Sequence, residues 1–139
     1  MTNLITRNKI YEVESAMQKM PQVDLKITEY FSHGVYGRAL HIPKGVMLTG
    51  RIHKFDNLNV LTQGKMMVST DEGMKTVSSG FTVLSPAGTK RIAVALEDCI
   101  WLTIIGTELK DGDTIEQEFT VASEQEYLAF CDTLKMIGE

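Results

Sequence analysis

The stretch GVMLTGRIHKFDNLNVLTQG, residues 45–64, decides the fold of this 139-residue chain. Gly45 is followed after five residues by Arg51-x-His53, after three more by Asn57 and after six more by Gly64. Residues two apart on a strand point to the same side. We therefore expect Arg51 and His53 to share one face, with Asn57 close enough to face the same interior.

A second stretch, GFTVLSPAGTKRIAVA at residues 80–95, is spaced with the same regularity. Gly80, Pro86, Gly88, Arg91 and Ala95 follow one another after gaps of five, one, two and three residues. A proline at the end of a strand removes no hydrogen bond from the ladder. The segment therefore indicates a turn followed by a strand from which Arg91 projects inward.

Together the two stretches resemble the two motifs of the cupin family. The first cupin motif reads glycine, five residues, His-x-His, three or four residues, Glu, six residues, Gly. The second reads glycine, five residues, Pro-x-Gly, two residues, His, three residues, Asn. The resemblance implies a mainly β fold: a single-domain jelly-roll barrel (double-stranded β-helix) spanning residues 1–139, with its core at about 25–121.

The same resemblance implies where chemistry should sit, and there this chain departs from the family pattern. Metal-binding cupins place three His and one Glu at positions that are here Arg51, His53, Asn57 and Arg91. A guanidinium stays protonated and has no lone pair to donate to a metal. Two cations therefore replace two neutral donors, and we expect no metal and no cofactor.

The remainder of the barrel region consists of short β-prone segments separated by turn-forming residues. Many short strands at this spacing are typical of a sandwich or barrel. We expect strands at residues 25–31, 35–42, 46–53, 57–62, 65–70, 74–78, 81–85, 90–95, 99–105 and 115–121.

A short helix is expected at each end of the barrel. Residues 7–20 carry an apolar stripe of Ile10, Val13, Met17 and Met20, which predicts a helix packed on the outside of the barrel. Ser123 and Glu126 form a capping box that opens a helix at residues 123–135. The apolar stripe of that helix is expected to contact the core.

Composition excludes several classes of protein. A net charge of −4 argues against non-specific binding to nucleic acid, which needs many Lys and Arg contacts to phosphate. No apolar run approaches the length of a membrane span, and no signal pattern opens the chain. Cys99 and Cys131 match no motif. We expect a cytoplasmic protein with two free thiols.

Two guanidiniums aimed into a sheltered cup predict a receptor for a carboxylate or phosphate. His53 can add a hydrogen bond or carry a proton. An apolar or stacking wall is expected from Trp101, Thr103 and Tyr36. These residues, with Arg51, Asn57 and Arg91, are the candidate ligand-binding set.

A purely structural interior is the alternative interpretation. In it Arg51 or Arg91 pairs with Asp56, Glu97 or Asp98, and side chains fill the lumen. Several other polar residues are expected outside the site: His33 and His41 at the surface, and Glu116 and Glu118 on a solvated strand face.

The whole chain is also similar to small cupin-like proteins of bacteriophages, through residues 51–59, 86–91 and 97–101. That resemblance implies a bacteriophage origin, and with it a protein of the host cytoplasm. Arg51 and Arg91 then favour a module, expected to be a homodimer, that sequesters a small anionic, possibly nucleotide-like, host metabolite or signal, with binding favoured over turnover. Two other functions stay open. One is a virion component or a binder of a host protein, and the other is an isomerase or lyase with His53 as general base.

Overall fold

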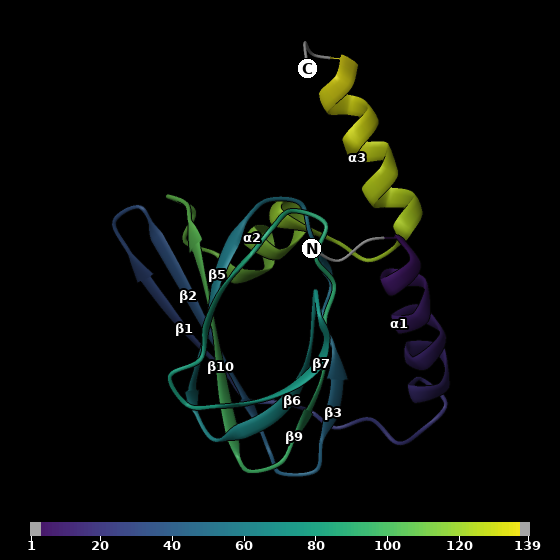
Figure 1. Ribbon diagram of the computed structural model, residues 1–139. Helices are drawn as coiled ribbons and strands as arrows, with labels where there is room; N and C mark the ends of the chain where they lie inside the picture. Colours follow the sequence, from purple (N-terminus) through teal and green to yellow (C-terminus); the bar gives the residue numbers. More distant parts are fainter. Residues whose placement is uncertain (1–3, 137–139) are drawn as a thin grey trace.

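Two antiparallel sheets curve around a common interior in the computed structural model, which describes residues 4–136 (Figure 1). This confirms the expected mainly β jelly-roll barrel with a short helix near each terminus. The larger sheet has the order β1 (Ile27–Ser32), β2 (Val35–Ile42), β10 (Cys99–Gly106), β5 (Asn57–Gln63) and β8 (Thr82–Ser85). The smaller has the order β3 (Met47–Thr49), β9 (Ile92–Ala95), β6 (Lys65–Thr70) and β7 (Gly73–Ser78).

The apolar core lies between the two sheets. Leu61 of β5 is fully buried against Met66 and Val68 of β6, and Ile42 and Ala95 complete the contact from β2 and β9. These residues alternate with exposed neighbours along their strands, as strands with one buried face require. Both cysteines are free thiols, and Cys99 belongs to this core.

The expected strand at residues 46–53 is interrupted. It forms β3, then a break at Gly50 and Arg51, and then the two-residue β4 (Ile52–His53). β4 does not pair with the main sheets but with β11 (Thr120–Val121), where His53 lies opposite Thr120. The break separates the environment of Arg51 from that of His53, although the two residues are only two apart.

The expected strand at residues 115–121 is wrong, because residues Gly112–Phe119 form the helix α2. Asp111 caps this helix, and its carboxylate accepts hydrogen bonds from the backbone N–H and the hydroxyl of Thr114, at 3.0 and 2.7 Å. Ile115 is buried beneath the helix. A capped helix with one buried apolar residue satisfies its backbone without a neighbouring strand, and only Thr120 and Val121 remain extended.

The terminal helices are α1 (Leu4–Met17), three residues earlier than expected, and α3 (Glu124–Met136), one residue later than expected. The apolar stripe expected on the first helix docks only in part. Ile10 is buried, whereas the side chain of Val13 is 40% exposed and Met20 lies beyond the helix end. Leu128 of α3 is likewise 51% exposed, and Figure 1 shows α3 leading away from the barrel.

The capping box at the start of α3 is present in a modified form. The backbone N–H of Glu126 donates to the hydroxyl of Ser123 at 3.2 Å, as expected. The carboxylate of Glu126 reaches back to the N–H of Ala122, at 3.2 Å. Two backbone donors are therefore satisfied at the helix entrance.

Buried cations join the helices to the barrel, in addition to the buried Ile10. Arg7 of α1 makes two hydrogen bonds to the carboxylate of Glu124, at 2.7 and 2.9 Å, and a third to the carbonyl of Gly88, at 3.1 Å. The buried ammonium of Lys90 donates to Glu14 at 3.1 Å and to the carbonyl of Gly50. Paired and hydrogen-bonded charges of this kind avoid the cost of an uncompensated buried ion.

No helix in residues 4–136 is long and apolar enough to cross a membrane.

Gly64 is the motif glycine with the tightest surroundings. It adopts a φ of +90°, and a Cβ built there would overlap the carbonyl oxygen of Asp98 and lie 2.8 Å from Sγ of Cys99. Gly45 has nearly the same φ, +88°, but nothing lies within 4 Å of its Cβ position. Substitutions at the two glycines therefore distinguish the cost of backbone strain, which both share, from the cost of a steric clash, which only Gly64 has.

We expect Gly64→Ala to lower the free energy of unfolding by about 3 kcal/mol, since a positive φ and a clash with backbone act together. Gly45→Ala, the matched control, should cost only about 1 kcal/mol, from the backbone strain alone. Urea unfolding of both variants measures the difference. Equal losses of unfolding free energy in the two variants would show that the close packing around Gly64 does not contribute to stability.

Candidate functional site

A cavity of about 460 Å³ opens in the interior of the barrel, so side chains do not fill the lumen. Its apolar lining includes Leu40, Met66, Val68 and Trp101, and its polar lining includes three arginines and His53. A smaller hollow of about 170 Å³ adjoins it under α2 and shares Arg38, His53 and Thr103 with it. The volume and the mixture of apolar wall and few polar groups are those of a small-molecule site.

His53 lies where the two hollows meet. The ladder between β4 and β11 fixes its backbone, and its carbonyl accepts a hydrogen bond from the N–H of Gly88 at 2.8 Å. Burial lowers the pKa of its imidazole to about 4, and the positive charges of Arg38, Arg91 and Arg51 add to that shift. The ring is therefore neutral near pH 7 and can both donate and accept a hydrogen bond.

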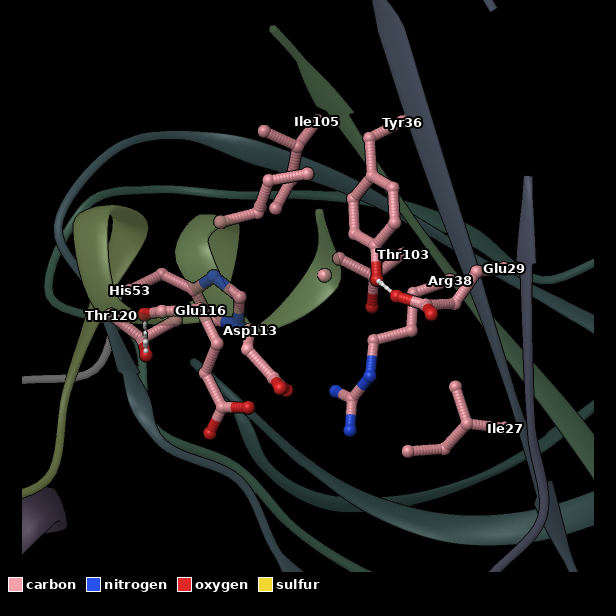
Figure 2. Close-up of a pocket in the computed structure, with 12 residues that line it drawn as sticks. Ile27, Glu29, Tyr36, Arg38, His53, Thr103, Ile105, Asp113, Glu116 and Thr120 are labelled. Carbon is pink, nitrogen blue, oxygen red and sulfur yellow. Dashed lines mark hydrogen bonds between the residues drawn. The ribbon is translucent and has the colours of Figure 1, made fainter. Parts of the chain in front are cut away.

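Arg38 of β2 is the cation that motif reasoning missed. Its side chain lines both hollows, and Figure 2 shows its guanidinium projecting into the space between β1 and α2. Within the described part of the chain it makes no hydrogen bond and no ion pair. The sequence did carry a signal for it: Arg38 is two residues after Tyr36, which was expected to face the lumen, and residues two apart on a strand face the same side.

Arg91 is held in place by neutral groups. One guanidinium nitrogen donates to the carbonyl of Ser69 at 2.7 Å and another to the hydroxyl of Ser85 at 2.8 Å. Its Nε is buried and has no hydrogen-bond partner among residues 4–136. Burial lowers the pKa of Arg91, but a guanidinium remains charged in proteins, so an unneutralised positive charge faces the lumen.

A buried polar network on β5, β8 and β10 supports Arg91. Ser85 donates to the amide oxygen of Asn59, and the amide nitrogen of Asn59 donates to Asn57 at 3.0 Å and to Thr103 at 3.1 Å. Such a chain fixes the orientation of each member. Asn57, expected to bind ligand, belongs to this network and does not line either hollow.

Arg51 lies at the rim rather than in the depth of the cavity. Its Nε donates to the hydroxyl of Thr120 at 2.7 Å and lies 3.3 Å from the carboxylate of Glu116. The expected structural bridges to Asp56, Glu97 or Asp98 are absent among the described residues. Glu116 is also misplaced in the sequence interpretation, because it lies on α2 and lines the cavity instead of a solvated strand.

The aromatic residues of the candidate set occupy different hollows. Trp101 lines the larger cavity and stacks on Phe81 with ring centroids 6.4 Å apart. Tyr36 lines only the smaller hollow, where its hydroxyl donates to the carboxylate of Glu29 at 2.6 Å. Burial raises the pKa of Tyr36, so this hydroxyl keeps its proton. Thr103 reaches both hollows.

An acidic side faces Arg38 across the smaller hollow. Glu29 of β1 and Asp113 and Glu116 of α2 line it, and Figure 2 shows the carboxylates of Asp113 and Glu116 directed into the same space as Arg38. Sequence reasoning missed Glu29 and Asp113. No motif contains them, and their position depends on how α2 packs against β1.

The other histidines lie outside the hollows, as expected. His33 is almost fully exposed, 3.6 Å from the carboxylate of Glu108. His41 faces the outside of the larger sheet and is hydrogen-bonded to the hydroxyl of Thr28 at 3.0 Å.

The donor groups of this interior do not fit a metal ion. Among residues 4–136 no three His, Cys, Asp or Glu side chains come together as a possible metal site. Of Arg51, His53, Asn57 and Arg91, only His53 has a nitrogen donor for a metal, and the amide oxygen of Asn57 already accepts a hydrogen bond from Asn59.

Comparison with solved structures identifies the fold. The chain is similar to KdgF from a Halomonas species (TM-score 0.52, 19% identity, covering 68% of this chain and 88% of that one). It is similar to a cupin superfamily protein from Desulfitobacterium hafniense (TM-score 0.51, 13% identity, 66% and 85%). A cupin domain of an XRE family transcriptional regulator from Enterobacter cloacae also matches (TM-score 0.51, 10% identity, 60% and 96%).

No protein-family model and no curated protein matches the sequence. At such low identities the structural likeness establishes the cupin fold.

The depressed pKa of His53 gives a pH dependence with a definite sign. Between about pH 6.5 and about pH 4 the unfolded chain takes up a proton on this ring that the folded protein does not. The free energy of unfolding should therefore decrease as the pH is lowered from about 6.5 to about 4, by up to about 1.4 kcal/mol per pH unit from this group. We expect His53→Asn to flatten that slope in denaturant unfolding at several pH values.

Proton NMR titration of the histidines gives an independent check, with the exposed His33 as a reference in the same sample. A midpoint of His53 near its ordinary value of about 6.5 would contradict the buried, arginine-surrounded ring. If the free energy of unfolding changes with pH equally in wild type and His53→Asn, the contribution of His53 to the pH dependence of stability is contradicted.

Proposed function

We propose that this chain is a metal-independent cupin-fold module that binds a small carboxylate, phosphate or nucleotide-like anion inside its barrel. The observation that supports it most is the set of three guanidiniums, from Arg38, Arg51 and Arg91, around a neutral His53 at one cavity. Guanidinium groups bind carboxylate and phosphate with paired hydrogen bonds.

The charges in the larger cavity leave a net attraction for an anion. Its lining contains three arginines and two carboxylates, Asp24 and Glu116. Arg51 is neutralised by Glu116 at 3.3 Å. Within residues 4–136, Arg91 has only neutral hydrogen-bond partners and Arg38 has none. An anion between Arg38 and Arg91 would gain two charge-assisted contacts without displacing an existing ion pair.

The remaining lining indicates what the rest of the ligand should be. Trp101, Leu40 and Met66 offer an apolar wall to a ring or short carbon skeleton. In the adjoining smaller hollow, Glu29 and Asp113 would repel a second negative charge and accept hydrogen bonds from hydroxyl or amino groups. A ligand with one anionic end and one hydroxylated or amino-bearing end fits both sides.

Binding is favoured over catalysis by the state of His53. A general base works best when its pKa is close to the working pH, and the pKa of His53 is about 4. The ring is better suited to accept or donate one hydrogen bond to a bound ligand than to abstract a proton. In this proposal the module retains or sequesters its ligand, as a bacteriophage protein would a host metabolite.

Calorimetry against a panel of small anions tests the proposal, with inorganic phosphate, benzoate, gluconate and adenosine monophosphate as probes. For any probe that binds, we expect Arg38→Gln and Arg91→Gln each to weaken affinity about 10- to 100-fold, the value of one charge-assisted hydrogen bond. Lys75→Gln is the matched control. It removes one positive charge from the exposed edge strand β7, away from both hollows, and should leave affinity unchanged.

A bound anion should also raise the pKa of His53 above its value of about 4, because it offsets the neighbouring guanidiniums. Binding that is insensitive to both arginine variants, or that leaves the His53 titration unmoved, would place the ligand elsewhere and overturn the proposal.

A further inference from the structure

The smaller hollow under α2 has the opposite charge from the larger cavity. Its lining includes the carboxylates of Glu29, Asp113 and Glu116 and a single guanidinium, that of Arg38. The lining of the larger cavity includes three guanidiniums and two carboxylates. His53 lines both hollows and is neutral near pH 7. A molecule that extends from the larger cavity into the smaller hollow therefore passes from a positive to a negative environment.

Glu29 and Arg38 lie opposite each other on neighbouring strands without forming an ion pair. They are partners in the register of β1 and β2, and both line the smaller hollow. Oppositely charged side chains at such positions ordinarily attract each other. Here the side chains diverge, and Figure 2 shows the guanidinium of Arg38 directed away from the carboxylate of Glu29. Within residues 4–136 neither charge therefore has an ionic partner.

Two contacts hold the carboxylate of Glu29 in this position. Tyr36, which is only 3% exposed, donates its hydroxyl hydrogen to Oε2 of Glu29 at 2.6 Å. Gly112, the first residue of α2, packs so closely that a Cβ there would overlap the same oxygen. Among the described residues no group donates a hydrogen bond to Oε1. The carboxylate is therefore fixed in place and keeps a free acceptor oxygen for a bound group.

Asp113 adds a second carboxylate to this hollow. It makes no hydrogen bond or ion pair in the part of the chain that the structure describes, and Figure 2 shows its carboxylate directed into the hollow. A neutral group that filled the hollow would displace water from Glu29 and Asp113 without compensating their charge, which is unfavourable. An ammonium group brings the compensating charge and three N–H donors.

We propose that the two hollows together select an ω-amino carboxylate, with its carboxylate between Arg38 and Arg91 and its ammonium between Glu29 and Asp113. The proposal rests on the anion site of the proposed function and adds the chemistry of the other end of the ligand. Of the two hollows, Arg91 lines only the larger, whereas Glu29 and Asp113 line only the smaller. A ligand that reaches both needs its charged groups at opposite ends of a chain rather than on neighbouring carbon atoms.

Isothermal titration calorimetry of the full chain at pH 7 tests the proposal with 6-aminohexanoate, 6-hydroxyhexanoate, hexanoate and adipate. These probes share one carboxylate and the same chain length, and they differ only at the far end. We expect 6-aminohexanoate to bind at least about tenfold more tightly than hexanoate, the value of one charge-assisted contact. 6-Hydroxyhexanoate should lie between them. Adipate should bind most weakly, because its second carboxylate meets Glu29 and Asp113.

Glu29→Gln and Asp113→Asn test the amine end of the site. Each should lower the affinity for 6-aminohexanoate about tenfold and raise the affinity for adipate, because a repulsive charge is removed. Affinities that change in opposite directions cannot come from a general loss of structure. Glu72→Gln is the matched control. It removes a carboxylate whose side chain is 77% exposed between β6 and β7, and it should leave all four affinities unchanged.

Equal affinities for 6-aminohexanoate and hexanoate overturn the proposal, and so does a parallel loss of affinity for every probe in the two acidic variants. If hexanoate still binds and Arg38→Gln weakens it, the anion site stands and only the amine preference fails. If none of the four probes binds, an ω-amino carboxylate is not the ligand. The panel of other anions described above then tests the anion site separately.

Discussion

Side-chain alternation along β2, β5 and β10 is the constraint on which the rest of the molecule depends. Each of these strands must satisfy two opposite environments with successive residues. On β2, Tyr36 and Arg38 face the lumen while Gly37 and Ala39 face outward. The cavity lining and the outer face are thus built from the same strands, and a register shift by one residue would exchange them.

Inside the barrel, repulsion among the clustered basic groups is reduced in three different ways. Arg51 has a carboxylate partner, Arg91 has a carbonyl and a hydroxyl, and His53 releases its proton. Arg38 has the least compensation of the four. Because an unpaired, half-buried charge is unfavourable, this guanidinium is the group that the proposed anion would stabilise most.

The barrel could be predicted from the sequence because glycine and proline positions report backbone geometry directly. Gly45, Gly64, Gly80 and Gly88 all adopt positive φ, which few other residues tolerate. The cavity could be predicted less completely. Arg38 lies outside both motifs, and Arg51 was expected deep in the lumen because the break at Gly50 has no clear signal.

α2 was missed for a different reason. Residues 115–121 alternate well enough to suggest a strand, and the Asp-Gly-Asp sequence before them reads as a turn. Only the N-cap hydrogen bonds of Asp111 and the burial of Ile115 decide for a helix. The acidic side of the cavity depends on that helix, so it could not be found from motif spacing.

The ionic contacts of α1 make the barrel dependent on a segment that its motifs do not include. Glu14 faces the buried ammonium of Lys90, and Arg7 joins Glu124 to the carbonyl of Gly88. Lys90 immediately precedes Arg91. A chain shortened to residues 25–121 would keep every motif residue yet take away the carboxylate opposite Lys90, and so loosen the loop that presents Arg91 to the lumen. The smallest unit that keeps this loop in place is therefore larger than the barrel itself.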